Sequence, residues 1–147
     1  MASSAPKVIL LKGSPIQKEA IAGEANIRPG MLLEMTSEGK VVSHNSASDT
    51  KGPLRIAREA EYIGGSIDDL YDDGDTVPYY VAKAGDEYYA LLQAGEDVAI
   101  GAKLQSAADG TLEAQTSTNP TVAIAREAVD NNPGTGGAAV RIKVEAV

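Results

Sequence analysis

Apolar and charged residues alternate strictly near the end of the chain. Between Ala139 and Glu145, the apolar residues Val140, Ile142 and Val144 are separated by charged ones, which places them on one face of a half-buried strand. Elsewhere, Gly and Pro interrupt short apolar runs at close intervals, a rhythm typical of many short strands rather than long helices. The pattern predicts an all-β fold, either a small β-barrel or a β-sandwich.

Two further strands are predicted in the middle of the chain. Thr76–Val81 and Glu87–Leu92 are rich in β-branched and aromatic residues, which favour strands. The residues between them include Gly85, so we expect the two strands to form a hairpin with this Gly in the turn. Pro78 has no N–H to donate to a sheet, and its strand is therefore expected to lie at an edge or to begin there.

Helix signals are short and weak. Ser66–Tyr71 is compatible with one or two helical turns capped by Ser66, and Ile16–Ala22 is also compatible with a helix. The outer regions 1–6 and 130–137 are small, polar and rich in Gly or Pro, as expected of a flexible arm and a surface loop. We expect residues 1–20 to form an N-terminal arm or first strand, and residues 21–147 to form a single β-rich domain.

The chain contains an internal quasi-repeat between residues 22–60 and 94–128. Each copy has an Ala-Gly-Glu motif, a later Gly and the sequence Ile-Ala-Arg-Glu-Ala. These lie at Ala22–Glu24, Gly30 and Ile56–Ala60 in the first copy, and at Ala94–Glu96, Gly101 and Ile124–Ala128 in the second. A repeat at a period of about 70 residues predicts two related β units, each ending in a strand that carries the Arg-Glu pair.

The repeated Arg-Glu pair has a catalytic and an architectural interpretation. Duplication of a structural unit explains two copies more simply than two active sites do. Adjacent residues of a strand point to opposite faces, so Arg58 and Glu59 are expected to contact a neighbouring strand or subunit rather than each other. A helix over Ile56–Ile63 is the alternative, because its apolar residues fit one helical face. The β-branched run Thr121–Ile124 in the second copy favours a strand.

Composition narrows the functional classes. The 147 residues include neither Phe nor Trp and only six Tyr, so the core is poor in large side chains. With 13 basic and 21 acidic residues the formal net charge is −8, which argues against nucleic acid and anionic membranes as partners. No apolar run is long enough for a membrane span or a signal peptide. The absence of Cys excludes disulfides and thiol chemistry. We therefore expect a soluble, unexported protein that relies on partners or copies of itself for stability.

The order and spacing of several short motifs resemble the head decoration, or cement, proteins of tailed bacteriophages. The resemblance covers most of the chain, from Ala22 to Ala128. The residues that carry it are Ala22–Glu24, Ile27–Glu34, Tyr71, Asp73–Pro78, Ala84–Glu87, Ala94–Glu96, Gly101, Leu104, Asp109–Leu112 and Ala125–Ala128. Each motif alone is a weak turn-and-strand signature, and their order is more specific. The termini vary within the family, so no contact residue is transferred from it.

The resemblance implies a non-enzymatic structural protein of the virion, made in the host cytoplasm and located on the outer surface of the capsid head. It would bind the major capsid protein and stabilise junctions between its subunits, as a homotrimer or, alternatively, a dimer. No cofactor, catalytic residue or metal site is expected. For attachment, the residues themselves suggest the apolar side chains near the N-terminus, Val8, Leu10, Leu11 and Ile16. The alternative is that Val8–Leu11 is simply a core strand.

Two other functional classes remain to be weighed. The only His, His44, stands in a polar stretch with Ser43 and Ser46, where a solvated loop is favoured over a hydrolase site because a triad depends on three-dimensional geometry. With no second His or Cys partner, it does not indicate a metal site. A carbohydrate-binding module on a virion surface would use exposed rings of the pairs Tyr79-Tyr80 and Tyr88-Tyr89.

Two loops invite ligand interpretations. The acidic cluster between Asp68 and Asp75 contains five Asp residues and Gly74, but it lacks the distal Glu of a helix-loop-helix calcium site. A turn whose Asp side chains cap local N–H groups is favoured over a Ca²⁺ site. Gly134–Gly137 lacks the Lys of a phosphate-binding loop and is followed by a charged strand, so we expect a flexible connection.

Overall fold

The computed structural model describes residues 6–131 and 138–147. Their regular elements are strands and one short 3₁₀ helix, η1 (Glu61–Ile63). The strands are β1 (Leu10–Lys12), β2 (Ile16–Ile21), β3 (Leu32–Met35), β4 (Val41–Ser43), β5 (Arg55–Ala57), β6 (Thr76–Val81), β7 (Glu87–Leu92), β8 (Asp97–Val98), β9 (Lys103–Ser106), β10 (Leu112–Ala114), β11 (Ala123–Ala125), β12 (Val129–Asp130) and β13 (Val140–Ala146). The all-β prediction is confirmed.

The second half of the chain forms a closed barrel of five strands, in the order β7-β10-β9-β11-β13, with β13 pairing back to β7. The β7–β10 pair is parallel and the other pairs are antiparallel. We call it the C-terminal barrel. The short strand β1 adds to it on the outside, antiparallel to the beginning of β7.

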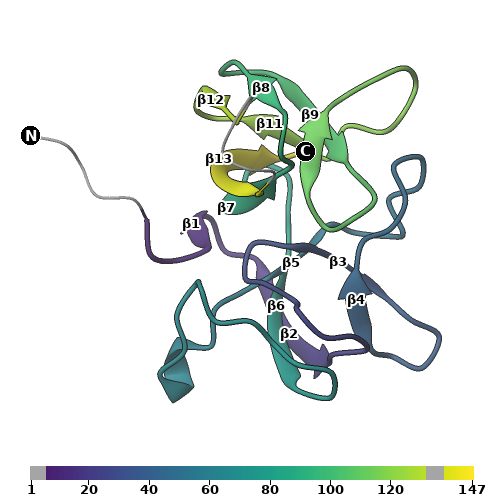
Figure 1. The fold of residues 1–147 in the computed structure, drawn as a ribbon, viewed down its shortest axis with the longest axis vertical. Coiled ribbons are helices and arrows are strands. Elements are labelled where there is room, and N and C mark those ends of the chain that lie inside the picture. Colours follow the sequence, from purple (N-terminus) through teal and green to yellow (C-terminus); the bar gives the residue numbers. More distant parts are fainter. Residues whose placement is uncertain (1–5, 132–137) are drawn as a thin grey trace, which may run out of the picture.

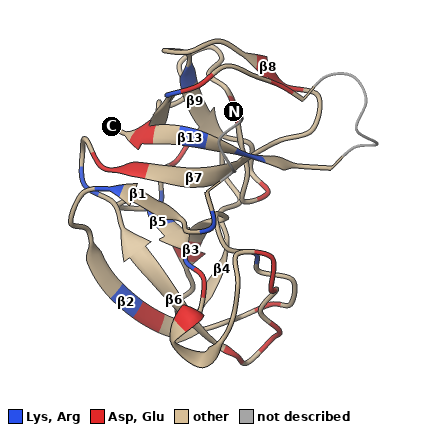
Figure 2. Cartoon of the chain, turned by 90° about the vertical axis from the view of Figure 1, so that its left-hand side faces the viewer, with Lys and Arg blue, Asp and Glu red and all other residues tan. Residues whose placement is uncertain are grey.

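The first half forms a five-stranded sheet in the order β2-β6-β5-β3-β4, which we call the N-terminal sheet. A parallel bridge between Ala22 and Val41 joins the end of β2 to the start of β4. The two sheets lie one above the other in both views (Figures 1 and 2). Each half thus has one parallel contact, β7–β10 in the C-terminal barrel and the bridge beside β2 and β4 in the N-terminal sheet. All other neighbouring strands of the N-terminal sheet are antiparallel.

The two sheets have the same strand order and the same register. Strands β2, β3, β4, β5 and β6 correspond to β7, β9, β10, β11 and β13. Glu19 pairs with Pro78 in the first sheet, as Tyr89 pairs with Lys143 in the second. The residues repeated in the sequence make equivalent hydrogen bonds in the two halves. The Gly30 N–H donates to the Ala57 carbonyl, as the Gly101 N–H does to the Ala125 carbonyl, both at 2.8 Å. The Ser43 N–H donates to Glu24 Oε1 at 2.5 Å, as the Ala114 N–H does to Glu96 Oε1 at 2.7 Å.

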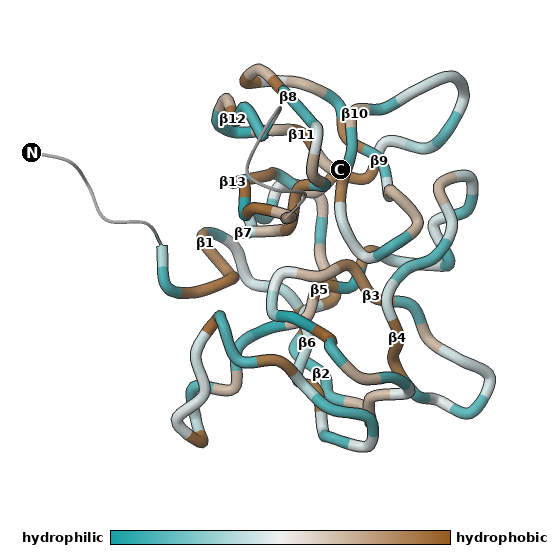
Figure 3. Tube along the Cα trace, in the orientation of Figure 1, coloured by the Kyte–Doolittle hydropathy of each residue, from teal (hydrophilic) through white to brown (hydrophobic). Residues whose placement is uncertain are grey.

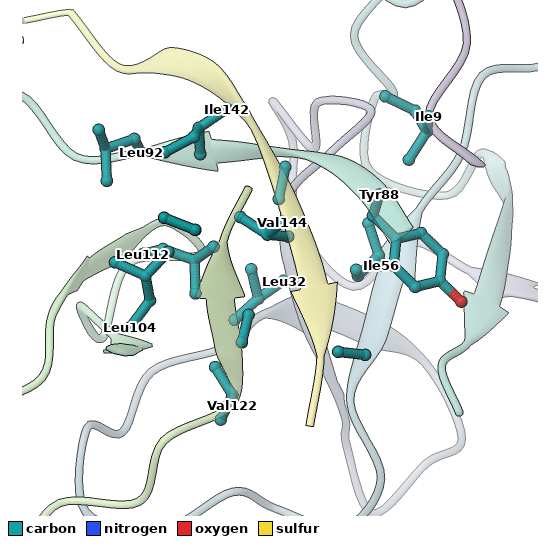
Figure 4. Close-up of a cluster of buried hydrophobic side chains, with 14 of the residues drawn as sticks. Ile9, Leu32, Ile56, Tyr88, Leu92, Leu104, Leu112, Val122, Ile142 and Val144 are labelled. Carbon is teal, nitrogen blue, oxygen red and sulfur yellow. The ribbon is translucent and has the colours of Figure 1, made fainter. Parts of the chain in front are cut away.

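A shared core joins the two halves. Leu32, Ile56 and Tyr80 come from the N-terminal sheet but belong to the same buried cluster as the side chains that fill the C-terminal barrel. Figure 4 shows Leu32 and Ile56 beside Val144 and Tyr88. A second, smaller buried cluster around Val77 and Tyr79 is formed by side chains of the N-terminal sheet and its connections. Because apolar burial is the main driving force for folding, each half depends on the other for part of its stability.

The predicted hairpin between Thr76–Val81 and Glu87–Leu92 is wrong. Both strands exist with these bounds, but β6 pairs with β2 and β5, whereas β7 pairs within the C-terminal barrel. The residues between them carry the chain from one sheet to the other, with Gly85 in a turn at φ 94°. Both strands are apolar on both faces, so their sequence did not reveal which neighbours they would have.

The expectation that Pro78 marks an edge strand is also wrong, because β6 lies between β2 and β5. The Pro78 carbonyl accepts the N–H of Arg58, the residue that follows β5. The N–H and C=O of one strand residue face the same neighbour. The N–H that Pro78 lacks would therefore face the β5 side, beyond the last residue of β5, where no strand is left to accept it. The hydrogen bonds between β6 and β2 are on the other side and are unaffected.

Neither predicted helix forms. Ile16–Ile21 is strand β2, paired with β6 along its whole length. Ser66–Tyr71 is a turn, in which the Ser66 hydroxyl accepts the Asp68 N–H and the Asp69 carboxylate accepts the Ser66 N–H. Such local side-chain bonds compete with helix formation. The strand favoured for the first Ile-Ala-Arg-Glu-Ala copy is confirmed in its first part, since β5 ends at Ala57 and η1 begins at Glu61.

Candidate functional site

The N-terminal segment lies along the edge of β7. The carbonyl of Ile9 accepts the Tyr89 N–H at 2.8 Å, and Leu10 pairs with Tyr88. Ile9 is fully buried, and its own N–H is bound by the Glu59 carboxylate at 2.9 Å. The hydrophobic stretch at β1 is therefore held at the side of the molecule by both halves of the protein (Figure 3).

The predicted attachment residues differ in exposure. Val8 is 50% exposed and Ile16 is 51% exposed, whereas Leu10 and Leu11 are partly buried. Sequence reasoning grouped Val8–Leu11 as one apolar run and did not single out Ile9, which is the residue that enters the core. Of the four predicted residues, Val8 and Ile16 therefore offer a partner the most exposed apolar side chains, each about half accessible, and their part in attachment stays a prediction.

The repeated Glu residues each bind a backbone N–H. Glu59 binds Ile9, as described, and Glu127 Oε2 accepts the Lys143 N–H at 2.9 Å. Both bonds tie the chain after the short strand to another segment: the N-terminal segment in one case and β13 in the other. This arrangement supports the architectural interpretation of the repeat, because each carboxylate is engaged with the main chain.

The two Arg side chains behave differently. Arg126 reaches the neighbouring strand, with its Nε 3.9 Å from Glu145 Oε1, as the sequence predicted. Arg58 Nε lies 3.9 Å from Oε1 of its own neighbour Glu59, a contact that the sequence did not predict. Both Arg-Glu pairs follow their short strand, β5 or β11, instead of lying on it. Arg58 also donates to Gln17 and Glu61 and lies over the Tyr80 ring.

The prediction of a solvated loop around His44 is wrong, because His44 is only 4% exposed and lies between the two halves. Its Nδ1 is 2.8 Å from Ser106 Oγ and its Nε2 is 3.0 Å from the Thr50 carbonyl. Because a carbonyl only accepts, Nε2 donates its N–H to the Thr50 carbonyl, and Nδ1 shares a hydrogen bond with the Ser106 hydroxyl. Ser106 Oγ in turn accepts the Ala108 N–H. The bonded partner of Nε2 is thus a carbonyl and not the carboxylate of a triad.

A pocket of about 200 Å³ borders His44, lined also by Leu32, Leu54, Val122 and Ala146. Its lining comes from both halves of the protein and is mostly apolar. Besides the imidazole, its polar groups come from Thr50 and Thr121. The pocket is a small, mostly apolar cavity with one imidazole in its wall, and its described lining residues include no Asp, Glu, Lys or Arg side chain.

The acidic cluster forms capped turns, as favoured from the sequence. Asp75 Oδ2 accepts the Asp72 N–H at 2.8 Å, and Asp69 Oδ2 accepts the Ser66 N–H at 2.8 Å. Asp68 pairs with Arg141 at 3.2 Å. Within residues 6–131 and 138–147, no group of three His, Asp or Glu side chains is placed to hold a metal ion. The Gly134–Gly137 segment lies outside the described residues.

Arg141 fixes this turn to β13. Its side chain is 7% exposed, and besides Asp68 it donates to the carbonyls of Pro29 and Ile67. Burial lowers the pKa of this guanidinium, and the nearby Arg28 lowers it further. A buried charge needs such partners, so Arg141 acts as a structural link between β13 and the β5–β6 connection.

The Tyr pairs are largely buried. Tyr79, Tyr80 and Tyr88 are all less than 9% exposed, and only Tyr89 is partly exposed. The rings of Tyr80 and Tyr88 lie 5.9 Å apart. A carbohydrate-binding surface needs exposed rings, so the pairs do not supply the stacking platform on which that alternative depended.

Sequence reasoning missed an exposed apolar group on the long connection between β5 and β6. Tyr62, Ile63 and Leu70 are each more than half exposed, and Ile63 and Leu70 line a pocket of about 300 Å³. A second pocket, of about 550 Å³, lies between Lys7 and Ser66–Asp68. The N-terminal segment and this connection therefore border the same hollow. None of the helical residues that the structure describes forms a helix long and apolar enough to cross a membrane.

The comparisons with known proteins identify a similar fold. No protein-family model and no curated protein sequence matches the chain. Among solved structures, the head fiber gp8.5 N base of bacteriophage phi29 matches with a TM-score of 0.54 and 13% sequence identity, over 91% of this chain and 98% of that one. The two chains share a fold. At this identity the match concerns the whole β architecture and no individual residue.

Proposed function

We propose that this protein is a structural component of a tailed-phage virion, which binds the outer surface of the capsid head and stabilises junctions between major capsid protein subunits. The observation that carries the proposal is the fold shared with a phage head fiber base over nearly the full length of both chains. The motif order between Ala22 and Ala128, which resembles phage decoration proteins, supports it independently of the fold comparison.

A non-enzymatic role accords with the chemistry of the described residues. The two features that first suggested catalysis, His44 and the repeated Arg-Glu pairs, are engaged in bonds that join segments of the fold. The net charge of −8 disfavours binding to nucleic acid or to an anionic membrane. It would also keep decorated particles apart from one another.

The stabilising mechanism would be additive. Each copy would bury a modest area on the shell, and attachment at many junctions would multiply weak contacts into strong overall binding. We propose a homotrimer as the attached unit, with a dimer as the alternative. Val8 and Ile16 are the best placed of the predicted contact residues, with Leu10 and Leu11 contributing from a partly buried position.

The first experiment combines the solution mass of the purified protein with co-sedimentation on phage heads that lack decoration. We expect a trimer that saturates the heads at a fixed stoichiometry and raises their resistance to heat. Val8→Ser and Ile16→Ser are expected to weaken binding, whereas Ile100→Ser, at a 67% exposed residue between β8 and β9, serves as the control. A monomer that does not sediment with heads would contradict the proposal.

A further inference from the structure

Strand β2 has one unoccupied edge. It pairs with β6 on one side, and all its residues except Ala20 are exposed. Within residues 6–131 and 138–147, no segment pairs with its other side between Ile16 and Ile21. Only beyond this strand, at Ala22, does the bridge to Val41 begin. A six-residue strand with a free edge is a template for another chain.

The outward-facing backbone groups can be assigned. The N–H and C=O of Ala22 bond to Asp75 and Gly74, on the side of β6. Because neighbours along a strand face opposite sides, the backbone groups of Ile16, Lys18 and Ala20 face β6 as well. Those of Gln17, Glu19 and Ile21 therefore point to the open side.

The equivalent edge in the C-terminal barrel is covered. There the N–H groups of Tyr89 and Leu91 donate to the carbonyls of Ile9 at 2.8 Å and Gly30 at 3.2 Å. By the shared register, Tyr89 and Leu91 correspond to Glu19 and Ile21. The next outward N–H has an acceptor in both halves: Gln93 donates to the Leu112 carbonyl and Gly23 donates to the Val41 carbonyl, both at 2.8 Å.

The duplicated fold thus shows what this kind of edge accepts. On β7 the cover is an extended, apolar segment that runs antiparallel and brings one fully buried side chain, Ile9. On β2 the same donors are present, and no segment among the described residues covers them. From this difference we propose that the free edge of β2 binds an extended segment of the shell protein as an additional antiparallel strand. The proposal rests on the proposed function, since that function supplies the shell protein as the partner.

The charges of β2 indicate what the segment carries. Lys18 and Glu19 lie next to each other at the middle of the exposed strand (Figure 2). Opposite charges across a strand pair are stabilising, so the bound segment should place an acidic residue opposite Lys18 and a basic one opposite Glu19. The exposed side chains of Ile16 and Ile21 offer apolar contacts at the two ends.

A second copy of β2 fits this edge poorly. The outward backbone groups belong to the odd-numbered residues Gln17, Glu19 and Ile21. Two copies that pair antiparallel through these groups therefore have to place odd-numbered residues opposite odd-numbered ones. The registers that then pair most of the strand are centred on Lys18 or on Glu19, and each sets like charges directly opposite one another. Because like-charged pairs are destabilising and charges on an edge are a common guard against self-association, a different chain is favoured.

The test compares Glu19→Pro with Glu19→Ala. Proline removes the outward N–H of residue 19 and leaves the bonds to β6 intact, whereas alanine keeps that N–H and removes only the charge. Both variants are first shown to fold by their thermal unfolding. We expect Glu19→Pro to bind undecorated heads about tenfold more weakly, in line with the loss of one or two hydrogen bonds, and Glu19→Ala to bind within about threefold of wild type, since an exposed charge pair is weak.

Hydrogen exchange supplies the second readout. Binding to heads should slow amide exchange in a proteolytic peptide that spans residues 16–21. Unchanged head binding by Glu19→Pro, or unchanged exchange in this peptide, would overturn the proposal while leaving head attachment itself intact. Protection that appears with rising protein concentration in the absence of heads would identify a second copy as the occupant and overturn it as well.

A third arm does not depend on the heads. A synthetic peptide with the sequence of residues 7–12, which includes the natural cover of β7, should slow exchange at the amides of Glu19 and Ile21. The amides of Tyr89 and Leu91, which already have acceptors, are the internal control. If wild type ignores heads, the proposed function fails; protection by the peptide then still supports β2 as a strand acceptor, and its absence overturns that inference too.

Discussion

Pro78 and Lys143 occupy equivalent positions in the two halves of the protein. The carbonyl of each accepts the backbone N–H of the repeated Arg, from Arg58 at 3.0 Å and from Arg126 at 2.8 Å. Lys143 has an N–H, which the repeated Glu127 binds. Pro78 has none, and Glu59 binds the N–H of Ile9 instead. One proline thus accompanies a change of partner, by which the repeated carboxylate holds the N-terminal segment.

We predict that Glu59→Ala loosens the N-terminal segment. The change leaves the buried N–H of Ile9 without an acceptor, which costs about 1–3 kcal/mol in the free energy of unfolding. Amide exchange at Ile9 should accelerate, and a protease should cut within residues 6–12. Glu127→Ala is the matched control, because it removes the equivalent carboxylate but should leave exchange at Ile9 unchanged. Equal protection of Ile9 in the two variants would show that Glu59 does not hold the segment.

Two equivalent glycines provide a test of hairpin packing. Gly39 and Gly110 both have positive φ, 79° and 85°, so alanine at either is strained by about 1–2 kcal/mol. A Cβ on Gly39 meets nothing within 4 Å, whereas one on Gly110 lies 2.5 Å from Met31 Cγ. We expect Gly110→Ala to lower the free energy of unfolding by about 1–3 kcal/mol more than Gly39→Ala does, as measured by urea denaturation. Equal losses would mean that Met31 moves aside without cost.

The protein should lose stability in alkali. Burial raises the pKa of Tyr88 above its ordinary value of 10.0, and the adjacent Asp86 raises it further. Folding thus favours the neutral phenol, so this contribution is complete below about pH 10 and is lost as the pH rises above that value. We expect Tyr88→Phe to weaken the protein at pH 7 by about 1 kcal/mol, through loss of the bond to Asp86.

The same variant should show a shallower loss of stability between pH 9 and pH 11. Denaturation curves at several pH values measure both effects. Tyr62→Phe, at an exposed ring, should keep the wild-type profile. If Tyr88→Phe loses stability in alkali as steeply as wild type, ionisation of another group governs the alkaline limb.

His44→Ala should destabilise the junction between the two halves. The substitution removes the bridge between Ser106 and Thr50 and enlarges a pocket of about 200 Å³, together costing about 2–4 kcal/mol. Ser106→Ala removes one of the two bonds and should cost less. Under conditions where His44→Ala is folded, we expect it to bind heads as wild type does. A folded variant with full stability would show that the imidazole does not join the two halves.

The sequence predicted the strands whose signal is local. The alternation at Val140, Ile142 and Val144 identified β13, and β-branched and aromatic residues identified β6 and β7 with their correct bounds. The partners of β6 and β7 were not predictable, because both strands bury residues on both faces and their pairing is decided by strands distant in sequence. The adjacent turn therefore suggested a hairpin that does not exist.

The sequence did not reveal the buried polar groups either, because their partners are also distant in the chain. His44 has polar neighbours in the sequence, but its bonded partner Ser106 lies 62 residues away. The N-terminal run Val8–Leu11 carried a clear apolar signal, yet only tertiary structure separates the buried Ile9 from the exposed Val8. Likewise, the exposure of Tyr62 and Ile63 follows from the course of the β5–β6 connection, whereas the apolar periodicity over Ile56–Ile63 grouped Ile63 with Ile56 on one face.

The position of β1 has a consequence for the order of folding. Ile9 and Leu10 are made long before β7, yet they pair with the beginning of that strand on the outside of the barrel. During synthesis, all strands of the N-terminal sheet are complete at Val81, before β7 begins, while the leading segment still waits for β7. Contacts of such long sequence separation form slowly. Seating of Ile9 should therefore be a late step, and refolding intermediates should expose this segment to association with other chains.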